Sequence, residues 1–170
     1  DIIVGADGIR SSVRKLLIGE EITPLRYLDC IVILGICPLS ALENIDSPLL
    51  DSATVFQTAN GNERIYMMPY DSNSVMWQLS FPMLEKEAKE LSSKGPKFLK
   101  EEACKRTQWH QPIPQILEAT LDAQISGYPV YDRELLTSEL LEKGKNVTLI
   151  GDAAHPMSPF KGQGANQALL

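Results

Sequence analysis

The chain of 170 residues has a globular composition, because 44% of its residues are hydrophobic and 22% are charged, and these fractions exclude intrinsic disorder. Its 16 Lys and Arg against 22 Asp and Glu give a net charge of −6, so we expect no nucleic-acid partner. The longest apolar stretch, Cys30 to Leu39, is shorter than the roughly 18 to 20 residues of a membrane helix and predicts a buried strand.

The cysteines and the chain ends indicate the setting of the protein. The three cysteines are odd in number and lack metal-ligand spacing, so we expect reduced thiols, no metal site and a cytoplasmic location. The chain opens on Ile2-Ile3-Val4 without an initiator Met and closes on Leu169-Leu170 inside a predicted helix. We therefore expect a middle section of a longer protein.

The first 20 residues predict a strand, a tight turn and a helix. Residues 1–6 are predicted to form a short strand around the apolar run Ile2-Ile3-Val4, Asp7-Gly8 is a turn pair, and helical spacing begins at Ile9. The hydroxyls of Ser11 and Ser12 are suited to cap this helix, and Gly19 to end it.

The middle of the chain predicts an antiparallel meander followed by helices. Strand patterns cover 27–39, 53–58, 63–68 and 74–81, with hairpin turns at 60–62 and 71–73. Helices are then predicted at 84–91, 97–107 and 114–120, and strands at 124–131 and 146–150. Asp132 and Arg133, after the first of these later strands, are expected to form an internal ion pair.

The segment from Gly151 to Gln167 has the pattern of a ligand site. A buried strand ends at a carboxylate, Asp152, a Pro-containing loop follows, and Gly162 to Gly164 open a helix. Ligands of α/β sheets bind beyond the strand ends, and small residues let a planar ligand approach the backbone. Asp152 is either an acceptor for a sugar hydroxyl or a turn and capping residue, and its spacing leaves both open. The Gly spacing is not a complete dinucleotide fingerprint.

Both ends of the chain resemble one family. Asp1 to Arg14 is similar to the Asp-Gly motif of the flavin-dependent aromatic hydroxylases, single-component monooxygenases with the p-hydroxybenzoate hydroxylase fold. Gly151 to Gln167 is similar to their Gly-Asp motif, and a sheet-rich segment of suitable size separates the two. The resemblance covers essentially the whole chain, but the family's amino-terminal Gly-rich motif and its carboxyl-terminal helices are absent from the sequence. We therefore expect a central fragment that does not bind FAD tightly alone.

The resemblance implies a fold of the α/β (α+β) class with two parts. Residues 1–24 and 140–170 would belong to a Rossmann-like FAD-binding domain, and residues 25–139 to an antiparallel-sheet domain that binds substrate.

The resemblance also implies roles for single residues. Asp152 would hold ribityl or ribose hydroxyls of FAD, Asp7, Gly8 and Arg14 would shape the cleft beside the pyrophosphate and the approach of the nicotinamide cofactor, and Pro159 would lie near the flavin ring. The amides of 162–166 would face the pyrimidine edge of the flavin, where a helix dipole stabilises negative charge. The implied cofactor-binding residues are Asp7, Gly8, Arg14, Gly151, Asp152, Pro159, Gly162, Gln163, Gly164, Ala165 and Asn166.

The implied function is hydroxylation of an aromatic or polyketide-like small molecule with NAD(P)H and O₂ through a flavin hydroperoxide. It needs no catalytic side chain, because the cofactor carries the chemistry. Arg64 and Gln78 are candidates for substrate contact on one sheet face, although a core stripe fits the same pattern and the sequence does not determine the face. His155 and His110 are expected to be structural. Alternatives are an FAD-dependent reductase or epoxidase on this scaffold, or a non-catalytic remnant that acts as a binding module. The sequence does not indicate the oligomeric state.

Overall fold

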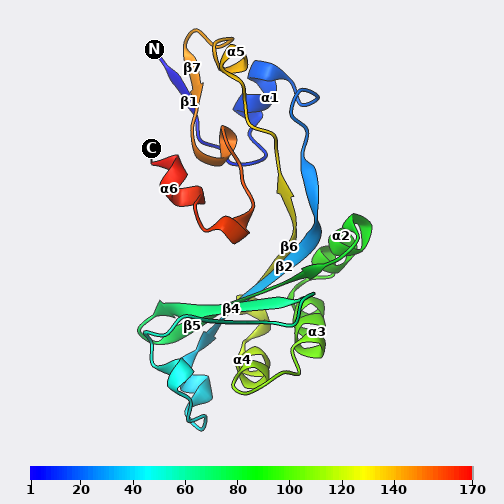
Figure 1. The fold of residues 1–170 in the computed structure, drawn as a ribbon, viewed down its shortest axis with the longest axis vertical. Helices are drawn as coiled ribbons and strands as arrows, with labels where there is room; N and C mark the ends of the chain where they lie inside the picture. The colour runs from blue at the N-terminus through cyan, green and yellow to red at the C-terminus, as the bar shows by residue number, and fades with distance from the viewer. Residues whose placement is uncertain (170) are drawn as a thin grey trace. The chain divides into compact units, whose positions relative to one another are not determined.

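The computed structural model describes residues 1–169, which divide into two compact units (Figure 1). The first unit is Asp1–Leu28 together with the chain from Tyr131 onward, and the second is Asp29–Val130. The predicted boundaries lay at 24/25 and 139/140. The structure differs because strands β2 (Arg26–Pro38) and β6 (Ile125–Asp132) each run across a unit boundary without interruption, so the sequence pattern of a strand continues where the unit changes.

The first unit is built on two parallel strands. β1 (Ile3–Gly5) pairs with β7 (Val147–Leu149) in the register Ile3↔Val147 to Gly5↔Leu149. Helix α1 (Ser12–Ile18) follows β1 and ends at Gly19, as predicted. It begins at Ser12 rather than Ile9, because the Ser11 hydroxyl accepts from the Arg14 amide at 2.9 Å and defines the first turn.

The remaining elements of the first unit are short. Helix α5 (Ser138–Leu141) precedes β7, and the 3-10 turns η4 (Gly151–Ala153) and η5 (Pro159–Lys161) follow it. Helix α6 (Gly164–Ala168) then begins at the last of the three predicted helix-opening residues.

The second unit contains a five-stranded sheet in the order β3-β4-β5-β2-β6. β3 (Phe56–Ala59), β4 (Arg64–Asp71) and β5 (Ser74–Pro82) form an antiparallel meander through the predicted turns at 60–62 and 71–73. The prediction of one continuous meander is wrong for β2, which pairs antiparallel with the free side of β5. A connection with 3-10 turns η1 (Leu39–Leu42) and η2 (Pro48–Leu50) carries the chain from β2 to the far edge.

Strand β3 starts three residues later than predicted for a local reason. Asp51 Oδ1 accepts from the amides of Ala53 at 2.9 Å and Thr54 at 2.6 Å. This side-chain-to-backbone turn uses amides that a strand would need for pairing.

One sheet face of the second unit forms its core. Val75, Trp77, Leu79 and Phe81 alternate on β5 and are buried. Helices α2 (Glu85–Ser93), α3 (Pro96–Arg106) and α4 (Ile113–Ala119) and the turn η3 (Asp122–Gln124) belong to this unit, and α3 and α4 lie on one side of the sheet (Figure 1). The Trp77 indole donates to the hydroxyl of Thr120, just after α4, at 2.9 Å.

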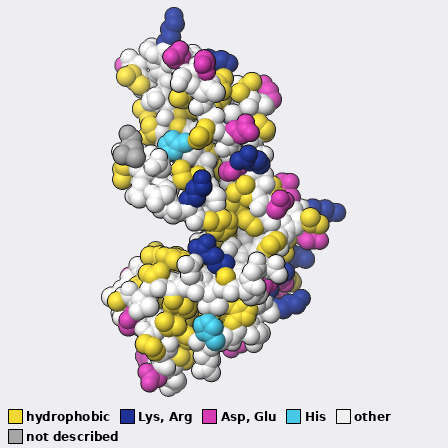
Figure 2. Space-filling model, viewed as in Figure 1, with side chains coloured by type: hydrophobic (Ala, Val, Ile, Leu, Met, Phe, Trp, Pro, Cys, Tyr) yellow, Lys and Arg dark blue, Asp and Glu magenta, His cyan; other side chains and the backbone are white. Residues whose placement is uncertain are grey.

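The sequence analysis expected neither a nucleic-acid partner nor a membrane helix, and the surface and the helices can be compared with these two expectations. Among the described residues visible in Figure 2, Lys and Arg side chains lie in several separate places rather than in one basic stripe. No helix within residues 1–169 is both long and apolar enough to cross a membrane.

Candidate functional site

An open hollow of about 440 Å³ lies in the first unit, where the two sequence motifs meet. We call it the Gly8–Asp152 hollow. Its walls come from the turn after β1, the turn after β7 and helix α6, through Ala6, Gly8, Ile150, Gly151, Asp152, Gly164, Ala165 and Ala168. The parallel pairing of β1 with β7 brings both turns to the same edge of the sheet. Five of the residues predicted from the sequence therefore share one cavity.

Asp152 is the acidic residue of the hollow. Its side chain is exposed, and it accepts no hydrogen bond from any residue in the described part of the chain. Its side chain therefore caps no helix, although Asp152 does lie in the 3-10 turn η4, as the turn part of the structural alternative expects. A carboxylate with free lone pairs in a cavity is available to hydroxyl or amide donors of a ligand.

The glycines that line the hollow differ in whether their backbone conformation requires glycine. Gly8 and Gly151 have φ of 76° and 57°, the left-handed region that L side chains rarely adopt. Gly164 is outside that region, and a Cβ built on it would meet no atom within 4 Å. Neither backbone strain nor internal packing requires glycine at 164, which lines the hollow.

Asp7 is next to the hollow but is occupied within the protein. Its carboxylate accepts from the Ser11 hydroxyl and from the amides of Ser12 at 2.7 Å and Val13 at 3.2 Å. These hydrogen bonds, that of Ser11 first, hold the pKa of Asp7 below its ordinary value of 3.8. The side chain thus fixes the amino-terminal end of α1, and Asp7 does not line the hollow.

Arg14 is also placed outside the hollow, buried with 2% of its surface exposed. Burial, followed by the charge of Arg133, lowers the pKa of its guanidinium. Its Nη1 donates to the carbonyls of Ala153 at 3.0 Å and Ala154 at 2.9 Å, so Arg14 joins α1 to the turn after β7.

The rest of the predicted Gly-Asp segment does not line the hollow. Pro159, Gln163 and Asn166 are exposed, and Gly162 ends η5 with a φ of 61°. Three lining residues were missed by the sequence reasoning, namely Ala6, Ile150 and Ala168. The signal for Ala6 and Ile150 was their position beside the two motifs, since each directly precedes a predicted site residue or its turn.

The two predicted substrate residues lie on the sheet of the second unit. Arg64 and Gln78 are half-buried on adjacent strands, on the face opposite buried Ile65, Trp77 and Leu79. The register pairs Gln78 with Tyr66 and Arg64 with Ser80, so Arg64 and Gln78 are diagonal neighbours. The structure thus puts Arg64 and Gln78 together on the half-buried face, opposite the core, and their contact with substrate stays a prediction.

The remaining candidate residues have structural partners. His110 lies 2.9 Å from the Thr58 hydroxyl and 2.8 Å from the Gln111 carbonyl. Asp132 and Arg133 do not pair with each other, because consecutive residues of an extended chain point to opposite sides. Asp132 instead pairs with Arg26 at 2.8 Å, and Arg133 with Glu20 at 2.9 Å. Within residues 1–169 we find no cluster of three or more metal-ligating side chains.

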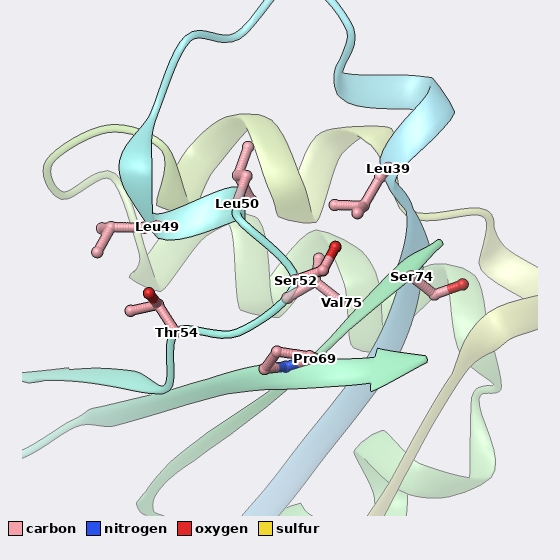
Figure 3. A pocket seen from close by; sticks show the side chains of 8 residues that line it. All are labelled: Leu39, Leu49, Leu50, Ser52, Thr54, Pro69, Ser74 and Val75. Carbon is pink, nitrogen blue, oxygen red and sulfur yellow. The ribbon is translucent and has the colours of Figure 1, made fainter. Parts of the chain in front are cut away.

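Two cavities of the second unit contain none of the predicted site residues. Figure 3 shows one of about 10 Å³, too small for more than about one water molecule. It is lined by Leu39, Leu49, Leu50, Ser52, Thr54, Pro69, Ser74 and Val75. The other is an open depression of about 510 Å³ around Pro38 to Ser40, Glu43, Asn73 and Ser74.

Comparison with known proteins assigns the family. The chain matches the FAD binding domain family over residues 1–170 and belongs to it. It is 31% identical over 169 residues to the aurachin C monooxygenase/isomerase of Stigmatella aurantiaca, covering 99% of this chain and 40% of that protein. It is 28% identical over 169 residues to the 3-amino-4-hydroxybenzoate 2-monooxygenase of Streptomyces cremeus, covering 99% and 38%. The chain thus spans about two fifths of the length of these relatives.

A solved structure shares the fold. The Klebsiella pneumoniae HpxO structure in complex with FAD and uric acid superimposes with a TM-score of 0.69 at 20% identity, covering 99% of this chain and 40% of that one. The expected α/β (α+β) fold and the resemblance to FAD-dependent monooxygenases are confirmed.

Proposed function

We propose that the full-length protein is an FAD-dependent monooxygenase that hydroxylates an aromatic or polyketide-like small molecule with NAD(P)H and O₂. Family membership and the monooxygenase relatives support the proposal. The observation that carries it is the Gly8–Asp152 hollow, in which an unpartnered carboxylate faces small residues from three separate segments. An acceptor carboxylate among small residues fits a ligand with hydroxyl donors and an extended chain, as FAD has.

The residues of the first unit divide into two groups in this proposal. Asp152 accepts from a ribityl or ribose hydroxyl of FAD, and Gly8, Gly151, Gly164 and Ala165 let the cofactor approach the backbone. The exposed residues of the same segment would face the flavin ring of a bound FAD, namely Pro159, Gly162, Gln163 and Asn166. Asp7 and Arg14 act indirectly, by holding the turns that form the hollow.

When bound, FAD supplies electron transfer from NAD(P)H to O₂ and so one oxygen atom for the substrate. The chain itself then binds the cofactor, orients the substrate and excludes water. No side chain of residues 1–169 is assigned as a nucleophile or general base.

The half-buried face of the second unit's sheet is the proposed substrate surface. Arg64 and Gln78 offer a cation and an amide there, beside the Tyr66 ring that pairs with Gln78 in the register. This combination suits a planar molecule with polar substituents. We propose a cytoplasmic location as well, because NAD(P)H is a reductant of the cell interior.

The proposal is tested on the purified full-length protein, with 3-amino-4-hydroxybenzoate and aurachin C as probes because two relatives are named for them. We expect a yellow flavoprotein whose NAD(P)H oxidation rises with a substrate, and isotopically labelled oxygen from O₂ in the product. Oxidation of NAD(P)H without incorporation of label would favour a reductase, and a colourless protein that does not take up FAD would contradict the proposal.

A further inference from the structure

Two arginines are buried beside the Gly8–Asp152 hollow without lining it. Arg14 is 2% exposed and Arg133 is 5% exposed. A buried guanidinium is costly unless its donors are satisfied, and only one carboxylate, that of Glu20, is paired with them within the described residues. The hydrogen bonds of the two side chains therefore indicate their role.

Arg14 holds one wall of the hollow. Its Nη1 donates to the carbonyls of Ala153 and Ala154, the two residues that follow Asp152. Its Nη2 also reaches the carbonyl of Glu134 at 3.2 Å. The guanidinium fork thus fixes the backbone on which Asp152 stands.

Arg133 holds a second wall, the turn after β1. Its Nε donates to the carbonyl of Ile9 at 2.8 Å, next to Gly8, and its Nη2 pairs with Glu20. This side chain therefore fixes the turn after β1.

Thr23 connects the two arginines and is itself 4% exposed. Its hydroxyl accepts from Arg14 Nε at 3.1 Å and Nη2 at 2.7 Å, and its carbonyl accepts from Arg133 Nη1 at 2.6 Å. Thr23 thus fixes the positions of both guanidinium groups. These groups in turn bind the carbonyl of Ile9 beside Gly8 and the carbonyls of Ala153 and Ala154 beside Asp152.

We propose that Thr23 is a positioning residue for the cofactor: through Arg14 and Arg133 it fixes the spacing between the Gly8 wall and the Asp152 wall. This inference takes its ligand, FAD, from the proposed function. The hydrogen bonds of Thr23 to Arg14 and Arg133, which we call the clamp, do not depend on that function. Thr23 touches no lining residue of the hollow in any described hydrogen bond, so its effect on FAD is transmitted by the arginines.

The test compares Thr23→Val and Thr23→Ser in the full-length protein. Valine keeps the shape and the carbonyl but removes the hydroxyl, so Arg14 loses the acceptor of its Nε and of one Nη2 bond, while Arg133 keeps the Thr23 carbonyl. We expect the Kd for FAD to rise about tenfold in Thr23→Val and to return within about twofold of the wild type in Thr23→Ser. The control is Thr107→Val, which removes a buried hydroxyl bonded to Ala103 in the second unit and should leave the Kd unchanged.

A second measurement needs no flavin. The amides of Ala154 and His155 both donate to the Gly151 carbonyl, and hydrogen exchange reports on them in the apoprotein. We expect faster exchange of peptides covering 151–158 in Thr23→Val, and unchanged exchange in those covering 6–11. If Thr23→Val does not fold, Arg14→Lys takes its place. It keeps the charge but loses the planar guanidinium, so we expect it to raise the Kd for FAD and to speed exchange at 151–158.

The outcomes separate the two proposals. Unchanged exchange at 151–158, or a Kd for FAD that rises no more than in Thr107→Val, would overturn the positioning role. A wild-type protein that binds no FAD would instead overturn the proposed function, and the exchange comparison in the apoprotein would still test the clamp.

Discussion

The two aspartates that follow β1 and β7 have different surroundings. Asp7 accepts three hydrogen bonds from the first turn of α1, whereas Asp152 accepts none from residues 1–169 and lines the hollow. Residue type alone does not separate them, because either carboxylate can cap a helix or bind a hydroxyl. The difference comes from the backbone, which continues into a helix after Asp7 and into a 3-10 turn at Asp152.

Removal of the Asp152 carboxylate should weaken FAD binding. We expect Asp152→Ala to lose roughly 1 to 3 kcal/mol of binding free energy, because a hydroxyl of the cofactor loses its acceptor. Titration of the full-length apoprotein with FAD, followed by flavin fluorescence, measures the loss. Asp46→Ala, which removes an exposed carboxylate of the second unit, is the matched control. Equal flavin affinity in both variants would show that Asp152 does not contact the cofactor.

The helix cap at Asp7 should make stability depend on pH. The pKa of Asp7 is lowered in the folded state by its hydrogen bond to Ser11, so its contribution is fully present above the ordinary pKa of 3.8. The contribution is lost as the pH falls through the lower, folded pKa. We expect Asp7→Asn to flatten this part of the pH dependence in urea unfolding between about pH 6 and pH 2. An identical pH dependence in wild type and variant would exclude the effect.

At the scale of elements, glycines mark where strands approach their neighbours closely. A Cβ on Gly5 would lie 2.6 Å from Leu149 Cδ2 and 2.8 Å from Val13 Cβ, so Gly5 lets β1 pack against both β7 and α1. A Cβ on Gly35 of β2 would lie 2.6 Å from Trp77 Cζ2. Both glycines have neighbours that a larger residue would displace, in contrast to Gly164.

Gly35→Ala should therefore disturb the core of the second unit. We expect the free energy of unfolding to fall by about 1 to 3 kcal/mol, as in other overpacked cores, with a change in Trp77 fluorescence. Chemical denaturation measures both. Gly164→Ala serves as the control and should not be destabilised, since its Cβ enters open space and alanine favours helix. A Gly35→Ala protein as stable as this control would show that the indole moves without cost.

Gly164→Val, unlike Gly35→Ala, should weaken cofactor binding without lowering stability. Gly164 lines the Gly8–Asp152 hollow, so we expect valine there to narrow it, and the fold should remain intact because the added Cβ would meet nothing within 4 Å beyond its chain neighbours and its own helix backbone. We expect weaker FAD binding and a lower rate of turnover at an unchanged free energy of unfolding. A variant with a normal flavin spectrum and turnover would place the cofactor elsewhere.

The elements were predictable from the sequence where local patterns determine them. The Asn60-Gly61 hairpin was predicted because Gly61 tolerates its φ of 96°, and the amphipathic strand β5 because its buried residues alternate. The place of β2 beside β5 was not predictable, because the connection 39–55 has no sequence signal for the edge it reaches.

At the scale of the whole molecule, the sequence predicted that two distant segments meet but not what holds them. The motifs carried residue types typical of a cofactor site, so Gly8, Asp152 and Gly164 were identified. Arg14 instead bonds the carbonyl of Ala153, 139 positions away in the chain. Every residue has a carbonyl, so such a contact leaves no trace in residue type, and the bonds of Arg133 to the carbonyls of Ile9 and Thr23 were missed for the same reason.

The most direct test of this account is a crystal structure of the full-length protein with FAD. We predict that the cofactor lies in the Gly8–Asp152 hollow, with the Asp152 carboxylate within hydrogen-bond distance of one of its hydroxyls and Gly164 in contact with it. FAD bound away from this hollow, with Asp152 exposed to solvent, would contradict the account.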